Sequence, residues 1–211
     1  MDAVESLASA LAEFPLVAIL RGIRPDEAIG IGQVLVDDGW QLIEVPLNSP
    51  QPLESIAALA ARFPHALVGA GTVLRPEEVR QVHVAGGRLV VSPNFNSAVV
   101  REARRLGMAC LPGVATATEA FAALEAGASG LKLFPAEMIP PAAVKALRAV
   151  LAPEVALLPV GGITQSNIAD YRQAGASGFG IGSSLYRPGL TPADVKQHSG
   201  AFTGCVAALR K

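Results

Sequence analysis

Cysteine and charged residues are scarce in this chain of 211 residues. The two cysteines, Cys110 and Cys205, lie far apart and do not form a disulfide framework, so we expect reduced thiols. Charged residues make up only 17 % of the chain and apolar residues 51 %, a balance that argues against disorder. Because the net charge is −1, nothing global favours nucleic acid or an anionic membrane as a partner.

The sequence also lacks a long hydrophobic run and a leader-like start. Residues 1–5 are acidic and lack the basic region of a signal peptide. The longest uncharged candidate for a membrane span, near residues 174–186, is too short and too rich in glycine and serine. We therefore expect a cytoplasmic protein that does not interact with membranes.

Metal-ligand and nucleotide-binding motifs are missing as well. His65, His83 and His198 fall in helical or connecting segments and do not cluster, and no carboxylate–histidine group has ligand spacing. No Walker-type loop is present, and residues 69–72 lack the third glycine and the later acidic residue of a dinucleotide-binding unit. The sequence therefore predicts no metal site and no nucleotide loop.

A repeated strand-and-helix rhythm runs through the chain. Helical segments end in glycine and a short apolar strand follows at once, as at residues 38–45, 85–91 and 126–133. The glycines recur near one or two multiples of about 20–25 residues, the length of a minimal strand-plus-helix unit. About eight strands are predicted, beginning near Val17, Leu42, Leu67, Arg88, Ala109, Leu131, Leu157 and Gly178.

This alternation predicts parallel strand pairing, and eight units predict an α/β fold of the (β/α)8 TIM-barrel type. A doubly wound open sheet is the alternative. Residues 2–13 are expected to form an extra N-terminal helix and residues 191–211 the closing helix. Because no linker interrupts the rhythm, residues 1–211 are expected to form a single domain. Proline or capping residues predict helix starts at residues 24–27, 49–51, 75–78, 116–119 and 164–167.

Three charged residues fall within predicted strands or at their carboxyl ends, where barrels of this type carry their chemistry. Arg21 ends the first strand, Glu44 lies in the second, and Lys132 interrupts the apolar sixth. Burial lowers the pKa of a lysine, and a neutral lysine can attack a carbonyl group to form a Schiff base. A neighbouring carboxylate can move the protons, and an arginine presents a planar cation to a carboxylate.

A satisfied buried ion pair is the alternative reading of each of these charges. Three charges directed at one end of a barrel nevertheless favour a catalytic site. Thr72, which ends the third strand, can add a hydroxyl hydrogen bond, although a cap or turn explains it nearly as well.

The last two strand ends favour a phosphate group. Such barrels often bind phosphate after strands seven and eight, and glycine lets the backbone approach an anion closely. Tight turns are the alternative reading of these glycines. The residues concerned are Gly161, Gly162, Gly182 and Ser183.

Seven segments, in order along nearly the whole chain, resemble the class I 2-keto-3-deoxy-6-phosphosugar-acid aldolases. The Gly-Ala-Gly-Thr-Val and Lys-x-Phe-Pro segments together are highly specific for this family. The matching segments are residues 18–23 (AILRGI), 43–50 (IEVPLNSP), 68–74 (VGAGTVL), 92–94 (SPN), 131–135 (LKLFP), 159–164 (PVGGIT) and 180–183 (GIGS).

The resemblance implies a homotrimeric TIM barrel without a metal or organic cofactor. It places the Schiff-base lysine at Lys132, the proton-transferring glutamate at Glu44 and the pyruvate-site threonine at Thr72. The remaining substrate-binding residues that it implies are Arg21, Pro93, Phe134, Gly161, Gly162, Gly182 and Ser183.

Two branches of the family differ in the C4 epimer that they cleave. Arg21 and residues 46–50 are similar to the 6-phosphogalactonate branch, with Arg21 taking the carboxylate in place of an arginine after the glutamate strand. Residues 134–137 (FPAE) are closer to the 6-phosphogluconate branch. The implied reaction is reversible cleavage of 2-dehydro-3-deoxy-6-phosphogalactonate to pyruvate and glyceraldehyde 3-phosphate, with the gluconate epimer, or both, as the alternative.

Two other classes of function stay open at this point. A phosphosugar isomerase or transferase on the same barrel would need metal ligands or a different acid–base pair, which the sequence does not show. A phosphosugar-binding protein without catalysis would use the same glycine loops but would form no covalent adduct with a ketone.

Overall fold

The computed structural model describes residues 2–209 and consists of alternating strands and helices. The strands are β1 (Leu16–Ile19), β2 (Leu42–Pro46), β3 (Leu67–Gly71), β4 (Leu89–Val91), β5 (Ala109–Leu111), β6 (Gly113–Val114), β7 (Leu131–Leu133), β8 (Leu157–Pro159) and β9 (Phe179–Ile181). The helices are α1 (Ala3–Glu13), α2 (Pro25–Asp37), α3 (Pro52–Arg62), α4 (Pro76–Val84), α5 (Ser97–Arg105), α6 (Ala117–Ala126), α7 (Pro141–Arg148), α8 (Ile168–Gln173) and α9 (Pro192–Leu209), with a 3-10 turn, η1 (Ala136–Met138).

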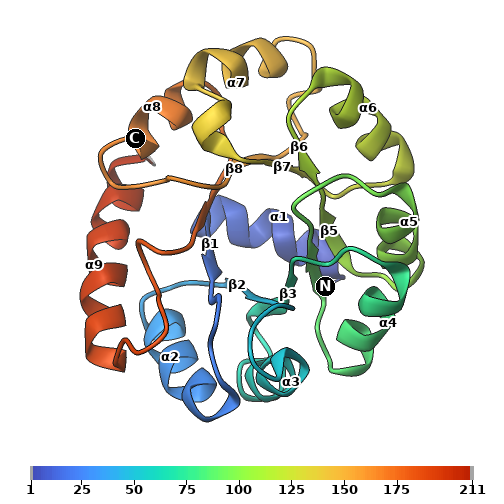
Figure 1. Cartoon of the computed structure of the whole chain (residues 1–211). Helices are drawn as coiled ribbons and strands as arrows, with labels where there is room; N and C mark the ends of the chain where they lie inside the picture. Colours follow the sequence, from blue (N-terminus) through green and yellow to red (C-terminus); the bar gives the residue numbers. More distant parts are fainter. Residues whose placement is uncertain (1, 210–211) are drawn as a thin grey trace.

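The strands close into a parallel barrel. Six of them pair in the order β5-β4-β3-β2-β1-β9, and three pair in the order β6-β7-β8. Pro112 separates β5 from β6, so the two halves of one barrel strand pair with β4 on one side and with β7 on the other. A bridge between Val160 and Gly180 joins β8 to β9. The (β/α)8 barrel is therefore confirmed, and the open doubly wound sheet is wrong (Figure 1).

One end of the barrel is plugged by α1, the extra N-terminal helix that the sequence predicts. Asp2 caps this helix, and its side chain accepts a hydrogen bond from the Glu5 N–H at 2.8 Å. The apolar face of α1, including Leu7 and Leu11, packs with the inward-facing residues Val17 and Leu42 at the strand starts. Because α1 covers the amino ends of the strands, only the carboxyl ends stay open (Figure 1).

Side chains alternate along each strand between the barrel interior and the surrounding helices. In β7, Leu131 and Leu133 belong to the outer core against the helices, so Lys132 between them faces the interior. In β2, Ile43 and Val45 belong to that outer core, so Glu44 faces inward as well. Strand register therefore places both predicted charged residues inside the barrel.

The helix starts agree with their sequence signals to within one residue. Residues 164–167 were predicted to start a helix, and α8 begins directly after them, at Ile168. The Asn167 side chain accepts a hydrogen bond from the Thr164 N–H, and the Thr164 carbonyl accepts one from the Ile168 N–H, as at the N-terminus of a helix. The closing helix α9 ends at Leu209 in the structure, and the last two residues of its predicted range lie outside the described residues.

No helix among residues 2–209 is long and apolar enough to cross a membrane.

Backbones approach closely where β3 meets β4. An added Cβ at Gly69 would overlap the carbonyl oxygen of Leu89, so Gly69→Ala must push these two strands apart. We expect this substitution to lower the free energy of unfolding by about 3 kcal/mol, the upper range for overpacking. Urea unfolding of the purified variant measures the change.

Gly204→Ala is the matched control, because an added Cβ there meets open space on the exposed face of α9. It should leave stability unchanged or raise it by about 0.5–1 kcal/mol through helix propensity. Equal unfolding midpoints for the two variants would contradict the close approach at Gly69.

Candidate active site

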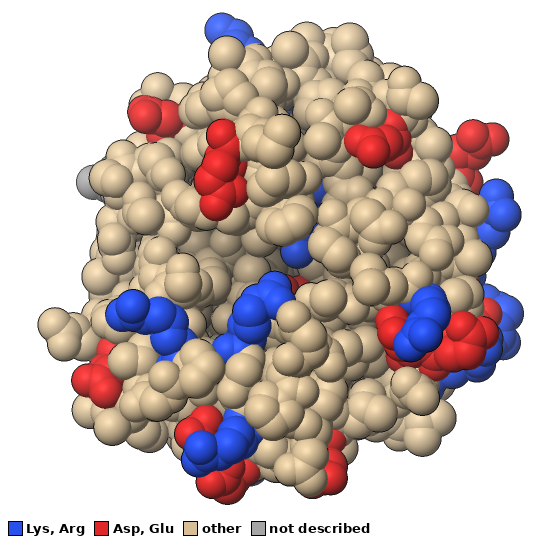
Figure 2. Space-filling model, viewed as in Figure 1, with Lys and Arg blue, Asp and Glu red and all other residues tan. Residues whose placement is uncertain are grey.

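The open end of the barrel contains a cavity of about 410 Å³. Its walls come from the carboxyl ends of β1, β7, β8 and β9 and from the loops that follow them. Figure 2 shows this face of the molecule hollowed near its centre, with basic side chains at the hollow. A smaller chamber lies against the same walls, and both Glu44 and Lys132 line it together with Ile19, Val160 and Gly180.

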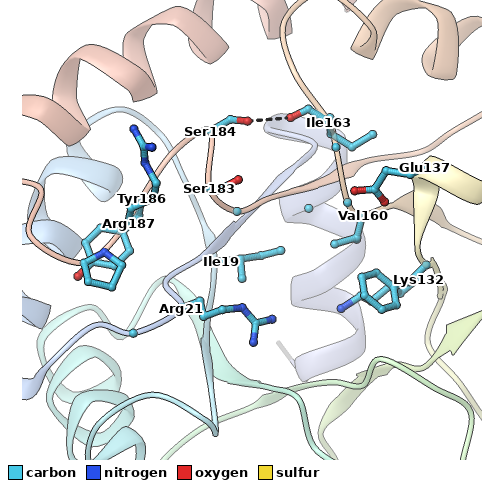
Figure 3. Close-up of a pocket in the computed structure, with 17 residues that line it drawn as sticks. Ile19, Arg21, Lys132, Glu137, Val160, Ile163, Ser183, Ser184, Tyr186 and Arg187 are labelled. Carbon is cyan, nitrogen blue, oxygen red and sulfur yellow. Dashed lines mark hydrogen bonds between the residues drawn. The ribbon is translucent and has the colours of Figure 1, made fainter.

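Lys132 is the most strongly desolvated basic group of the site. Its side chain is 5 % exposed and points from β7 into the cavity (Figure 3). The ammonium nitrogen lies 4.7 Å from the centre of the Phe134 ring. Burial lowers the pKa of Lys132, the Arg21 cation lowers it further, and the Glu44 carboxylate opposes both effects. The neutral amine that a Schiff base requires is thereby favoured.

Glu44 is 2 % exposed and occupies space that glycine leaves free. An added Cβ at Gly71 would lie 2.8 Å from the Glu44 carboxylate carbon. One carboxylate oxygen, Oε2, is buried without a hydrogen-bond partner among the described residues. Burial raises the pKa of Glu44, while the charges of Lys132 and Arg21 lower it.

No direct ion pair joins Lys132 to Glu44 within the described chain, although both line the smaller chamber. The satisfied buried pair considered from the sequence is therefore absent, and an orphaned carboxylate oxygen faces the interior. A buried polar atom left without a partner calls for another explanation, and a reacting substrate supplies one.

Arg21 lies at the mouth of the cavity, where the end of β2 holds it in place. Its Nη1 donates a hydrogen bond to the Asn48 side-chain oxygen at 2.9 Å, and the next backbone N–H, of Gly22, donates to the buried Ser49 hydroxyl at 2.9 Å. In Figure 3 its guanidinium group extends toward Lys132. Arg21 is thus a cation with a fixed direction beside the lysine.

The two predicted phosphate segments meet on the same wall of the cavity. Gly161 and Gly162 both have positive φ, 106° and 61°, which only glycine adopts readily. The Ser184 hydroxyl donates to the Ile163 carbonyl at 3.2 Å and ties this turn to the segment after β9. Gly161, Gly162, Gly182 and Ser183 all line the cavity, as do Arg21, Lys132 and Phe134.

Two predicted substrate residues lie outside the large cavity. Thr72 follows β3 directly, is half-buried, and has a φ of +57°, which is rare for a β-branched residue. Its neighbour Gly71 lies against the Glu44 carboxylate. Pro93 is half-buried after β4, and its backbone packs so closely on Gly113 that a Cβ there would overlap the Pro93 carbonyl. Neither residue lines the wall of the cavity.

Sequence reasoning missed several residues that the structure adds to the cavity wall. Glu137 comes from η1 after β7, and Tyr186 and Arg187 come from the loop after β9. The Tyr186 hydroxyl donates to the Glu27 carboxylate at 3.1 Å and so anchors that loop to α2. The sequence offers one weak signal, namely that all three residues follow within six residues of the end of β7 or β9, but this spacing does not show that they face the cavity.

Within residues 2–209, no group of three or more His, Cys, Asp or Glu side chains could hold a metal ion. Burial raises the pKa of the Cys110 thiol to about 12, so this cysteine is an unreactive core residue.

Fold and site together define a class: a (β/α)8-barrel protein with a desolvated lysine and a carboxylate inside the open end of the barrel, the arrangement of a Schiff-base enzyme. The family model described as "Aldolase: KDPG and KHG aldolase" matches residues 7–198. The chain therefore belongs to the KDPG and KHG aldolase family, whose members are class I carbon–carbon lyases.

Individual relatives are similar over most of the chain. A probable 2-dehydro-3-deoxy-6-phosphogalactonate aldolase of Rhizobium meliloti is 49 % identical, over 89 % of this chain and 89 % of the relative. The 2-dehydro-3-deoxy-6-phosphogalactonate aldolase of Escherichia coli K12 is 48 % identical, over 90 % and 93 %. The KHG/KDPG aldolase of the same organism is 34 % identical, over 79 % and 78 %.

Among solved structures, one reported as native KDPGal is 46 % identical in sequence. It superposes with a TM-score of 0.91, over 93 % of this chain and 96 % of that chain. At this identity and coverage the similarity extends to the whole barrel.

The charges of Glu44 and Arg21 should change the pKa of Lys132 in opposite directions. Glu44→Gln removes the carboxylate that raises the pKa of Lys132, so the pKa of the lysine should fall. Arg21→Ala removes a cation that lowers it, so the pKa should rise. At one fixed pH, acetylation of Lys132 should then become faster in the first variant and slower in the second.

Competitive acetylation followed by mass spectrometry measures both changes, with the exposed Lys145 of α7 as the internal standard. Identical labelling of Lys132 in the two variants would show that the charges of Glu44 and Arg21 do not shift the pKa of Lys132.

Proposed function

We propose that this chain is a Schiff-base aldolase that reversibly cleaves 2-dehydro-3-deoxy-6-phospho-D-galactonate to pyruvate and D-glyceraldehyde 3-phosphate. The observation that carries the proposal is the desolvated amine of Lys132 in the same small chamber as the Glu44 carboxylate. The identity of 48–49 % to two 6-phosphogalactonate aldolases supports this substrate.

Lys132 performs the covalent step. Its neutral amine adds to the C2 ketone of the substrate to give a carbinolamine, which loses water to form a protonated imine. The buried position of the amine lowers its pKa and so favours the nucleophilic form. The positive imine then accepts the electron pair of the C3–C4 bond as that bond breaks, and pyruvate stays on Lys132 as an enamine.

Glu44 moves the protons of the cycle. It protonates the departing hydroxyl of the carbinolamine and, directly or through one water, takes the proton of the C4 hydroxyl as the C3–C4 bond breaks. The same proton returns to C3 when the enamine becomes an imine, which water then hydrolyses. Burial raises the pKa of Glu44 above its ordinary value, and a carboxyl with a raised pKa serves as both acid and base.

The substrate carboxylate lies between Lys132 and the mouth of the cavity. Arg21 offers it a cationic fork whose direction is set by Asn48, and Thr72 offers a hydroxyl group from beside Gly71. The strained backbone of Thr72 supports this role, because strain of this kind is concentrated at functional positions. Phe134 and Pro93 complete the contacts around the ketone.

The phosphate group lies at the opposite wall, on the glycine turns after β8 and β9. Gly182 accepts hydrogen bonds from the N–H groups of Leu185 and Tyr186, which forms one helical turn after β9. The N–H groups of Ser183 and Ser184 take part in no hydrogen bond of the described residues, so they are available to an anion, as are the contacts at Gly161 and Gly162.

The assembly and location of the enzyme are further parts of this proposal. The family resemblance favours a homotrimer, and the composition favours the cytoplasm. Neither nucleic acid nor a membrane is proposed as a partner. The expected ligands are the keto-deoxy sugar acid phosphate, pyruvate and glyceraldehyde 3-phosphate.

Lys132→Ala should lose turnover by on the order of a thousandfold or more, because no other lysine of residues 2–209 lines the cavity to form the imine. Lys132→Arg should fail equally, since a guanidinium stays protonated. Borohydride added with pyruvate should reduce the imine and leave a stable adduct on the peptide that contains Lys132. Lys145→Ala, on the outer helix α7, is the control and should keep full turnover.

Turnover in Lys132→Ala close to that of the unaltered enzyme would rule out the imine route. A trapped pyruvate adduct on Lys132 would exclude a phosphosugar-binding protein without catalysis.

Assays of the two C4 epimers side by side test the choice of substrate. We expect kcat/KM for the 6-phosphogalactonate epimer to exceed that for the 6-phosphogluconate epimer by at least about tenfold, a difference of about 1.4 kcal/mol in transition-state binding. Residues 134–137 resemble the gluconate branch, so the gluconate epimer is the alternative substrate. A preference in the opposite direction would assign the chain to that alternative.

A further inference from the structure

Glu137 places a carboxylate on the glycine turn where the proposed phosphate group must lie. An added Cβ at Gly161 would lie 3.1 Å from the Glu137 carboxylate carbon, and one at Gly162 would lie 3.2 Å from its Oε1. The Glu137 side chain therefore fills the space that the two glycines leave open. Figure 3 shows it on the cavity wall above Val160 and across from Arg21.

Two hydrogen bonds hold the backbone next to Glu137. The N–H of Ala136, the preceding residue, donates to the Val160 carbonyl at 2.9 Å, and the Tyr171 hydroxyl donates to the Ala136 carbonyl at 2.9 Å. These bonds tie η1 both to the end of β8 and to α8. The backbone next to Glu137 is therefore held against the glycine turn.

The Glu137 carboxylate has no counter-ion among residues 2–209. Arg21, Lys132 and Arg187 line the same cavity, yet none of them forms an ion pair with it, and no hydrogen bond of the described residues uses its oxygens. The Glu137 carboxylate does affect a neighbouring group. The pKa of the Tyr171 phenol is raised mainly by burial and to a smaller extent by this carboxylate.

A phosphate group on the glycine turn must share this space with a like charge. Two anions a few ångström apart repel each other, and solvent screens part of this repulsion because Glu137 is exposed. A carboxylate has no role as a ligand for a phosphate dianion, so Glu137 weakens the contact that the glycines provide.

We propose that Glu137 is a specificity-determining residue that holds the affinity of the site for a phosphate-bearing substrate end below the affinity that the glycine turns alone would give. The residue competes with phosphate for the same turn by charge and by volume. This inference rests on the proposed function, because it needs the phosphate group at Gly161 and Gly162.

The test is the equilibrium binding of inorganic phosphate to the full chain, measured by titration calorimetry, for the unaltered protein and for Glu137→Gln. This substitution removes the charge and keeps the shape. We expect the dissociation constant for phosphate to fall about tenfold. The gain should be larger above the second pKa of phosphate than below it, because the dianion is repelled more strongly than the monoanion. A merely structural role of Glu137 would not produce this difference.

Two controls accompany the measurement. Glu154→Gln removes one charge from the exposed connection between α7 and β8, at the opposite end of the barrel, and should leave phosphate binding unchanged. In the aldol direction, Glu137→Gln should lower KM for glyceraldehyde 3-phosphate while KM for pyruvate stays within about twofold, since pyruvate lies at Lys132, away from the turn.

Unchanged or weaker phosphate binding in Glu137→Gln would overturn the inference, as would an equal gain in Glu154→Gln. Calorimetry with inorganic phosphate does not depend on turnover. Absence of aldol cleavage or of the trapped imine, together with tighter phosphate binding in Glu137→Gln, would therefore count against the proposed reaction and not against the role of Glu137.

Discussion

The site depends on one constraint: a lysine must be kept out of water without an acid directly against it. Lys132 satisfies this constraint because strand alternation turns it into the barrel interior, while its neighbours Leu131 and Leu133 pack outward on the helices. Its closest charged partners, Glu44 and Arg21, act on it with opposite signs. A direct ion pair with Glu44 would hold the amine protonated. The observed separation leaves both groups shifted toward their neutral forms, as a step that adds an amine to a ketone requires.

Small residues make this arrangement possible. Gly71 leaves room for the Glu44 carboxylate, and Gly180 leaves room for the side chains of Ile19 and Val160. The interior of a (β/α)8 barrel is ordinarily filled by branched side chains. Here such residues, with α1, fill the amino-terminal end, and glycines hollow the carboxyl-terminal end. The chamber thus depends on the absence of side chains at these glycines as much as on the charged residues.

Much of the fold and part of the candidate site could be predicted from the sequence, for physical reasons. Strand periodicity and glycine caps are local signals, and they gave the strand positions, the barrel and the inward direction of Lys132 and Glu44. Glu137 and Arg187 could not be predicted, because their approach to the cavity depends on how the turns after β7 and β9 fold back. Thr72 and Pro93, which the family resemblance implies at the substrate, lie beside the large cavity and not on its wall, and their contact with the substrate stays a prediction.

Because α1 covers one end of the barrel, the cavity opens only at the other end. Leu7 and Leu11 close the far end against Val17 and Leu42, so nothing can pass through the cylinder from one side to the other. A molecule that reacts at Lys132 must enter from the open end, where the glycine turns after β8 and β9 form one wall of the cavity. In the proposed reaction the aldehyde phosphate is not bonded to the enzyme, so it leaves through this single opening before the fragment joined to Lys132 is released.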